Sequence, residues 1–391
     1  MKTPKFEIIA GTYEQFLLGF PFVSKQAELV QSFAVHGHSS SIRCVATSDK
    51  YLASGGADDR IIVYDLNTRK EHCILNQHEA TINCLQFTSD SSHLLSGSSD
   101  GELCIVRAGS WQLEKKWAKA HQGASILDIA VHPSGKLALT LGSDRSLRTW
   151  NLIKGRQAYI INLNSKSKDA KSLERIIWAE DGVRFILAGG KYTEIWSIET
   201  GGLLQAIEHH EKVTSCLWMS EDVLLVGYED GQIASVNINE SSKELRKAHE
   251  ARVKALGKYS KWIVSASSNG EIKVWNKRLN ELAKHETECR ITCFAIVSSN
   301  LKIKEEADED ALEAADELAE KEPVRKSTVI VEVENSDEEV SFGNVVKSES
   351  SGDGLKGKRK KKKRKAGSNE VETGSKDSKV KRDKKRKRSS V

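Results

Sequence analysis

Short runs in which apolar and polar residues alternate, separated by Gly, Ser and Asp, recur along the first 300 residues of the chain. One unit contains the runs 42–46, 51–56 and 61–65. Alternation with a period of two predicts short β-strands, and the small residues between the runs predict tight turns. Six units end in an aromatic or aliphatic residue followed by a polar one: Tyr64-Asp65, Val106-Arg107, Trp150-Asn151, Trp196-Ser197, Val236-Asn237 and Trp275-Asn276. These ends lie 42, 44, 46, 40 and 39 residues apart, which predicts an array of all-β repeats.

A histidine opens five of the units: His38, His78, His121, His209 and His249. With the period, this arrangement resembles WD40 repeats, in which each unit forms one four-stranded blade of a β-propeller. The resemblance implies that the histidine, a strand Ser or Thr, a turn Asp and the terminal Trp form a buried hydrogen-bonded chain within a blade. The residues at these positions are His38, Ser54, Asp58 and Tyr64; His78, Ser96 and Asp100; His121, Thr140, Asp144 and Trp150; His209 and Asp230; and His249, Ser265 and Trp275. We interpret them as structural and not catalytic, because a buried polar chain of this kind stabilises a fold when every member is paired.

The units differ in how completely they match this pattern. The unit of His121 has all four residues. Tyr64 replaces the Trp in the first unit, whereas Val106 and Val236 lack the indole. We expect the last link of the chain to be missing from the blades that end in valine.

One unit, between Trp150 and Trp196, is degenerate. It lacks the opening histidine, and Gly190 stands where the turn Asp is expected. An insertion, residues 164–172, precedes it. The insertion is interpreted either as a longer surface loop or as a loop that contacts a partner, since loops on rigid scaffolds often carry function.

Strand-like runs that belong to no complete unit stand at both ends of the repeats. Residues 6–10, 12–20 and 29–35 precede the first unit, and residues 290–297 follow the last. Joining them gives a seventh, composite blade, and a closed ring has no free sheet edge that could recruit other strands. We therefore predict an all-β fold, a seven-bladed WD40 β-propeller with a composite closing blade, over residues 1–300.

Residues 301–391 differ in composition from the repeats. Phe342 is the only aromatic residue after Leu301, so this segment lacks the side chains for a core, and we predict a disordered, charged C-terminal tail. Its acidic part, 305–339, has 15 acidic and three basic residues, and its basic part, 340–391, has 19 basic and six acidic residues.

Two basic clusters lie in the second part of the tail: Lys358, Arg359, Lys360, Lys361, Lys362, Lys363, Arg364 and Lys365, and Lys384, Lys385, Arg386, Lys387 and Arg388. Such clusters are typical of nuclear import signals and of segments that contact RNA phosphates. We expect a nuclear import receptor as a partner, with localisation in the nucleus and nucleolus; the alternative is a solvated tail that only increases solubility. Ser336 precedes three acidic residues and is a candidate phosphorylation site, where a phosphate would add to the local negative charge.

The sequence offers little for catalysis. It contains no P-loop, no GxSxG nucleophile motif, no HExxH and no zinc-spaced set of Cys and His, so we predict no enzyme, no metal and no cofactor. The seven cysteines include no CxxC pair, which fits a reducing compartment. No apolar run approaches membrane-spanning length and no signal peptide is evident, so we expect a soluble intracellular protein without membrane contact.

Several short sequence motifs narrow the choice of family. They are Tyr13-Glu14-Gln15 with Leu18-Gly19-Phe20, HPSGKLAL at 132–139, DRSLRTWNL at 144–152 and IVSASSNG at 263–270. Together with the basic tail, they resemble the p21-activated protein kinase-interacting protein 1-like family over residues 6–297. The N-terminal phrase is the most discriminating, because a His-Pro-x-Gly turn occurs in many WD40 proteins.

The family resemblance implies a binding protein with two possible roles. One is assembly of the large (60S) ribosomal subunit and maturation of pre-rRNA in the nucleolus, with pre-60S proteins and pre-rRNA as partners. The other is binding and negative regulation of a p21-activated kinase in signalling. The basic tail favours the first role, and we expect a monomer within larger assemblies. The alternatives, a WD40 substrate receptor of a ubiquitin ligase and a histone-binding chromatin adaptor, are supported only by analogy of fold.

Overall fold

A computed structural model of the protein describes residues 5–23, 28–240 and 242–298. Within these ranges the regular elements are β-strands and one short 3-10 helix, η1 (Leu163–Ser165). No helix in the described part of the chain is long and apolar enough to cross a membrane.

Six antiparallel sheets, each made from one continuous stretch of chain, form six blades in chain order. The first blade contains β5 (Ile42–Thr47), β6 (Tyr51–Gly56), β7 (Ile61–Asp65) and β8 (Lys70–Leu75). The second contains β9 (Ile82–Phe87), β10 (His93–Ser98), β11 (Leu103–Arg107) and β12 (Leu113–Trp117). The third contains β13 (Ile126–Val131), β14 (Leu137–Gly142), β15 (Ser146–Asn151) and β16 (Arg156–Asn162).

The other three continuous blades follow in the same way. The fourth contains β17 (Leu173–Trp178), β18 (Arg184–Gly189), β19 (Tyr192–Ser197) and β20 (Gly202–Glu208). The fifth contains β21 (Val213–Trp218), β22 (Val223–Tyr228), β23 (Gln232–Asn237) and β24 (Lys243–Lys247). The sixth contains β25 (Val253–Tyr259), β26 (Trp262–Ser267), β27 (Glu271–Trp275) and β28 (Glu281–Glu286).

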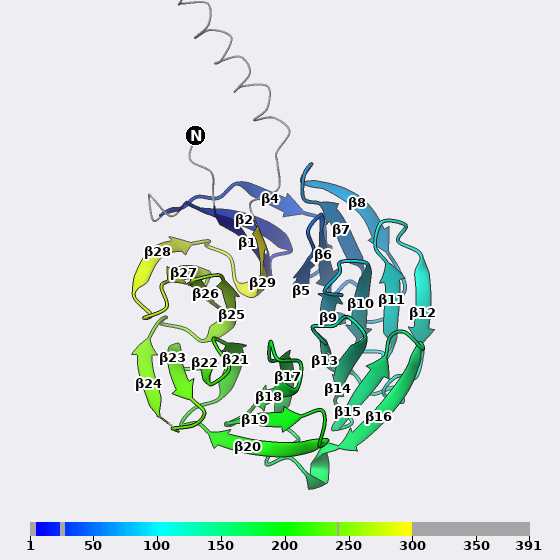
Figure 1. Cartoon of the computed structure of the whole chain (residues 1–391). Coiled ribbons are helices and arrows are strands. Elements are labelled where there is room, and N and C mark those ends of the chain that lie inside the picture. Colours follow the sequence, from blue (N-terminus) through cyan, green and yellow to red (C-terminus); the bar gives the residue numbers. More distant parts are fainter. Residues whose placement is uncertain (1–4, 24–27, 241, 299–391) are drawn as a thin grey trace, which may run out of the picture. The chain divides into compact units, whose positions relative to one another are not determined.

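The closing blade combines the two ends of the described chain. It contains β29 (Ile291–Ser298), β1 (Phe6–Thr12), β2 (Phe16–Val23), β3 (Glu28–Leu29) and β4 (Phe33–His36). β1 lies between β2 and β29 and is antiparallel to both, with Ile9 opposite Gly19 on one side and Ala295 on the other. The predicted seven-bladed propeller with a composite closing blade is therefore confirmed, and Figure 1 shows the seven sheets around one central axis with the first strand of each blade innermost.

Burial follows the position of a strand within its blade. All six residues of β6 are buried, because a middle strand packs against the neighbouring blade on each face. By contrast, all five residues of the outermost strand β24 are exposed, and three of them are Lys or Arg. Charged outer strands prevent the free edge of each sheet from pairing with other chains.

A β-bulge recurs near the start of every innermost strand. In β5, for example, the pairing register shifts between Ile42 and Cys44. The residues left out of the pairing are Arg43, Asn83, Leu127, Glu174, Thr214, Lys254 and Thr292, one from each blade. Bulges redirect side chains, and six of these seven, all except Thr214, line a single cavity on the axis of the ring.

Candidate functional site

The third blade contains a complete hydrogen-bonded chain. His121 Nδ1 lies 3.0 Å from Asp144 Oδ1, and Nε2 lies 2.7 Å from Thr140 Oγ1. The Trp150 indole N–H donates to the same hydroxyl at 2.9 Å. Burial alone would raise the pKa of Asp144, but hydrogen bonds from His121 and Ser146 outweigh this and lower it. The carboxylate therefore only accepts, so His121 donates through Nδ1 and accepts the Thr140 hydroxyl proton at Nε2.

The first blade has two of these three links. His38 Nδ1 lies 2.9 Å from Asp58, and Nε2 lies 2.8 Å from the Ser54 hydroxyl. The hydroxyl of Tyr64 is buried and makes no well-aligned hydrogen bond with a described residue. Tyr64 thus fills the space of the indole without extending the chain, which corrects its placement among the hydrogen-bonded residues.

In the second blade, the hydrogen-bonded chain stops at His78 and does not reach Asp100. His78 Nε2 lies 2.8 Å from Ser96 Oγ, but Nδ1 lies 3.4 Å from Asp100 without hydrogen-bond alignment. Burial lowers the pKa of His78, so the ring is neutral near pH 7. Asp100 and Glu102 approach this ring closely enough to share a cation with it, and the Lys116 amine, 2.5 Å from Glu102, supplies a positive charge there.

The sixth blade uses a different carboxylate from the expected one. His249 Nε2 lies 2.7 Å from Ser265, which accepts from the Trp275 indole at 2.8 Å. Nδ1 lies 2.5 Å from Glu271, because the turn holds Asn269 in place of an aspartate. Sequence reasoning missed Glu271, although an acidic residue two positions after a turn Asn was a usable signal.

In the fifth blade, the prediction that His209 pairs with Asp230 is wrong. His209 Nδ1 lies 2.8 Å from the Tyr228 hydroxyl, and Nε2 lies 3.0 Å from Thr193 Oγ1 of the fourth blade. Asp230 instead lies 3.4 Å from His210. The strand position of the expected Ser or Thr is Val226, which has no hydroxyl, so the histidine bonds to the neighbouring blade.

The fourth blade has a buried carboxylate where the other blades use a histidine. Glu194 of β19 is 0% exposed and accepts from the Trp196 indole at 3.1 Å. Its other oxygen accepts from the Ser167 hydroxyl at 2.9 Å and from the Lys168 backbone N–H at 2.5 Å. Glu194 was not identified from sequence, although it is an acidic residue inside an otherwise uncharged strand, two positions before the Trp.

The insertion 164–172 is the segment that makes these contacts. It begins within η1, and its Ser172 packs beside Gly190, whose φ is +55°. A Cβ at Gly190 would come within 2.6 Å of the Ser172 side chain. The insertion is therefore a structural part of the fourth blade and takes the place of the missing histidine.

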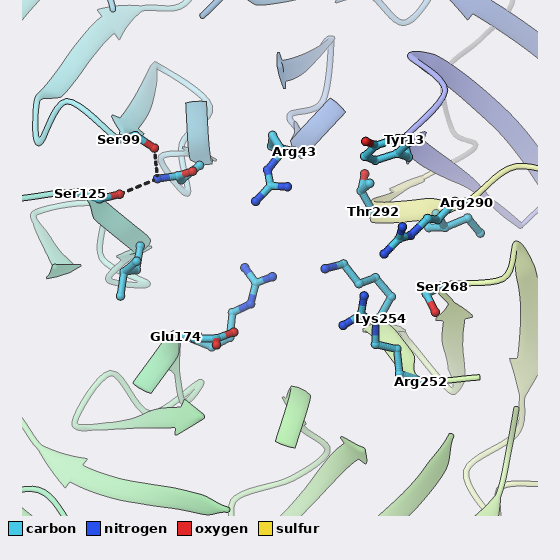
Figure 2. Close-up of a pocket in the computed structure, with 14 residues that line it drawn as sticks. Tyr13, Arg43, Ser99, Ser125, Glu174, Arg252, Lys254, Ser268, Arg290 and Thr292 are labelled. Carbon is cyan, nitrogen blue, oxygen red and sulfur yellow. Dashed lines mark hydrogen bonds between the residues drawn. The ribbon is translucent and has the colours of Figure 1, made fainter. Parts of the chain in front are cut away.

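A cavity of about 450 Å³ lies where the bulged residues of the innermost strands meet. Five cationic side chains line it: Arg43, Arg175, Arg252, Lys254 and Arg290. Glu174 is the one carboxylate in the lining. Figure 2 shows Arg43, Lys254 and Arg290 reaching toward the axis from three neighbouring blades, the first, the sixth and the closing one. The formal charge of the lining is thus five minus one, or +4.

Two of the cations have partners nearby, and so does the carboxylate. Arg252 lies 3.7 Å from Glu229, and Glu174 lies 3.6 Å from Lys212. The guanidinium of Arg290 stacks on the Tyr13 ring at 5.5 Å. The other three cations of the lining are Arg43, Arg175 and Lys254.

Arg43, Arg175 and Lys254 form no ion pair within the described residues. Burial, followed by the charges of Arg175, Arg252 and Arg43, lowers the pKa of Lys254 to about 8. Burial alone would lower the pKa of Arg175, but the charges of Asp128 and Glu174 raise it, so this guanidinium is already stabilised in the fold. The surrounding cations leave the charge of Lys254 unfavourable until an anion joins it. The cavity is therefore the strongest candidate for a binding site in the described part of the propeller.

The remaining predicted site residues lie outside the described residues. They are the two basic clusters, 358–365 and 384–388, and the phosphorylation candidate Ser336.

Comparison with known proteins places the chain among WD40 proteins. The model for "WD domain, G-beta repeat" matches residues 27–65, 69–106, 112–151 and 240–276. "p21-activated protein kinase-interacting protein 1-like" from Gallus gallus is 36% identical over 306 residues, covering 74% of this chain and 80% of the relative. "Shk1 kinase-binding protein 15" from Schizosaccharomyces pombe is 27% identical over 315 residues, covering 78% and 88%. "Protein MAK11" from Saccharomyces cerevisiae is 25% identical over 361 residues, covering 76% and 84%.

The matched segments omit residues 152–239, which hold the fourth blade and most of the fifth. These are the blades in which Glu194 replaces the histidine and Val226 replaces the strand hydroxyl. The sheets are nevertheless complete. The repeat pattern therefore fails where the buried hydrogen bonds change, and the four-stranded architecture is kept.

Proposed function

The chain belongs to the p21-activated protein kinase-interacting protein 1-like family, and from this premise we propose that it is a non-catalytic WD40 scaffold for assembly of the large (60S) ribosomal subunit. In this role it takes part in maturation of pre-rRNA in the nucleolus, with pre-60S proteins and pre-rRNA as partners. A nuclear import receptor carries it into the nucleus. The observation that carries the proposal is the basic part of the chain, 340–391, with 19 basic and six acidic residues. A dense block of cations binds RNA phosphates with release of counterions and without reading the bases.

The propeller supports a binding role over a catalytic one. The histidines and most of the acidic residues that the repeat pattern singles out are used in hydrogen bonds within or between blades, as at His38, His121 and His249. These three histidines are also buried, so a substrate could not reach them. What the ring presents to partners is a rigid surface and the cationic cavity on its axis.

Purification of the full chain from cells, followed by sequencing of the bound RNA, tests the ribosomal role. We expect precursors of large-subunit rRNA, with recovery lower by roughly 10-fold or more after the Lys and Arg residues of 358–365 and 384–388 are changed to glutamine. The matched control changes Lys243, Arg246 and Lys247, exposed cations of β24, to glutamine and should keep the RNA. Recovery of histones or ubiquitin-ligase subunits without these precursors would support the alternatives instead.

Binding of a p21-activated kinase is a second proposed function. It is favoured by the printed names of relatives, which include "p21-activated protein kinase-interacting protein 1" and "Shk1 kinase-binding protein 15". We expect the purified chain to bind such a kinase and to slow its activation in an autophosphorylation assay. A chain that recovers rRNA precursors but leaves kinase activation unchanged would retain only the first role.

A further inference from the structure

The cationic cavity has properties that holding the ring together does not explain. A propeller axis can be filled with apolar or neutral polar side chains, yet here it carries five cations and one carboxylate. Desolvated like charges destabilise the folded state. We propose that this cavity is a binding site for a compact polyphosphate, a small molecule whose several phosphate groups are clustered on one ring or chain. This proposal goes beyond the scaffold function above and does not depend on it.

The neutral part of the lining is arranged to donate hydrogen bonds into the cavity. The Asn83 amide N–H group donates to Ser99 Oγ and to Ser125 Oγ, both at 3.0 Å, and to the Ile126 carbonyl at 2.8 Å. A hydroxyl that accepts one bond keeps its own proton for another acceptor. The hydroxyls of Ser99 and Ser125 both line the cavity, so their protons are available to phosphate oxygens.

The placement of the cations selects a compact anion. Arg43 comes from the first blade, Arg175 from the fourth and Lys254 from the sixth, so the charges converge on one volume from different directions. An extended strand of RNA presents its phosphates in a line and is better matched by a groove. A cavity of about 450 Å³ is within the usual size of small-molecule sites.

The fold holds these side chains in place before any ligand binds. Arg43 and Lys254 are bulge residues, and each is followed by a strand paired with its neighbour. Arg175 directly follows the bulge residue of β17. A site held by rigid elements loses little freedom when a ligand enters, which favours affinity. The repeated bulge thus orients the cations without support from a ligand.

Isothermal titration with inositol hexakisphosphate tests the proposal. The protein is the full chain with the cations of 358–365 and 384–388 changed to glutamine, so that the tail does not bind the probe. We expect one molecule bound per chain, with affinity reduced roughly 10-fold to 100-fold by Lys254→Met or Arg43→Gln. The matched control is Lys258→Met, which removes a cation from the same strand at its contact with Glu180, outside the cavity. This variant should bind as the parent does.

Thermal unfolding separates loss of binding from loss of folding. The probe should raise the melting temperature of the parent and of Lys258→Met but not that of Lys254→Met. Without the probe, Lys254→Met should be at least as stable as the parent, because it removes a cation surrounded by cations. Equal affinity of the parent and the two cavity variants would overturn the proposal.

Further probes separate the possible sources of phosphate. Vesicles that contain phosphatidylinositol bisphosphate test a lipid headgroup, and binding to them that depends on Arg43 and Lys254 supports the same site with a membrane-borne ligand. A 12-nucleotide single-stranded RNA and a poly-glutamate peptide test extended anions. If either of these binds through Arg43 and Lys254 while inositol hexakisphosphate does not, the compact ligand is the wrong one.

Discussion

The third and fourth blades have the same four-stranded topology but satisfy their buried polar groups differently. In the third blade, His121, Thr140, Asp144 and Trp150 form one chain within a single repeat. In the fourth, Glu194 bonds to the indole of Trp196 and to an inserted loop. The architecture therefore requires a paired partner for the indole and not a histidine as such. A carboxylate serves equally well when a loop covers it and supplies donors.

The largest expected effect comes from removing the carboxylate of the fourth blade. Glu194→Ala leaves the Trp196 indole, the Ser167 hydroxyl and the Lys168 backbone N–H without their acceptor in a buried site. We expect the free energy of unfolding to fall by about 3–5 kcal/mol, measured by urea denaturation.

Asp144→Ala in the third blade is the matched change. Its side chain is 23% exposed, so water can replace the lost acceptor, and we expect a smaller loss of about 1–3 kcal/mol. Glu194→Gln keeps one acceptor oxygen and should fall between the parent and Glu194→Ala. An Asp144→Ala variant that loses more stability than Glu194→Ala would show that the loop does not seal the fourth blade.

A second prediction concerns the pH dependence of the free energy of unfolding and the part of it that comes from His209 in the fifth blade. Burial, then the charges of Lys243 and His210, lower the pKa of His209 to about 4, against about 6.5 in an unfolded chain. Between these values only the unfolded state takes up the proton. The contribution of His209 to the free energy of unfolding should therefore be constant above pH 6.5 and should fall by about 3 kcal/mol as the pH drops to 4.

Urea denaturation at several pH values measures this contribution. His209→Gln should remove that part of the slope between pH 6.5 and 4. His36→Gln, at an exposed histidine of the closing blade, should keep the slope of the parent. An unchanged slope in His209→Gln would mean that the ring is protonated in the fold and that its bonds to Tyr228 and Thr193 are different from those described.

The smallest effect is expected in the first blade. Among the residues that the structure describes, the Tyr64 hydroxyl has no well-aligned hydrogen-bond partner, so Tyr64→Phe removes a polar group without such a partner and keeps the ring. We expect a change within about 0.5 kcal/mol, whereas Trp150→Phe in the third blade should cost about 1–3 kcal/mol because Thr140 loses its donor and a space opens. Chemical denaturation of the two variants side by side measures the difference. A loss above 1 kcal/mol in Tyr64→Phe, on the same order as a typical hydrogen bond, would show that the hydroxyl is bonded after all.

The architecture could be predicted because it depends on local patterns. Alternation of apolar and polar residues predicts the strands, and the steps between unit ends predict the number of repeats. The strand-like runs left over at both ends then predict a composite blade, which the structure contains. The partner of His209 could not be predicted in this way. It depends on Val226 and on the Thr193 hydroxyl of the neighbouring blade. The spacing of residues along the sequence does not indicate that these two positions act together.

The cationic cavity was missed for a related reason. Arg43, Arg175 and Lys254 stand far apart in the sequence and look like ordinary polar positions in half-buried strands. A bulge turns each of these strands by one residue near its start, and a period-two pattern gives no sign of that turn. The cations also do not share one position in the repeat: Arg43 and Lys254 are second in their strands, whereas Arg175 is third.

The position of β1 between β2 and β29 has a consequence for how the chain is made. A ribosome releases β1 before the six blades that follow it, and its partner β29 comes some 280 residues later. At about 5–20 residues per second, β1 waits on the order of 15–60 s beside β2 with one edge unpaired. Six blades can form during that time, yet the ring stays open until the strand ending at Ser298 has emerged. Until synthesis passes the last blade, a nascent chain therefore carries an unpaired strand edge of the kind that recruits other strands.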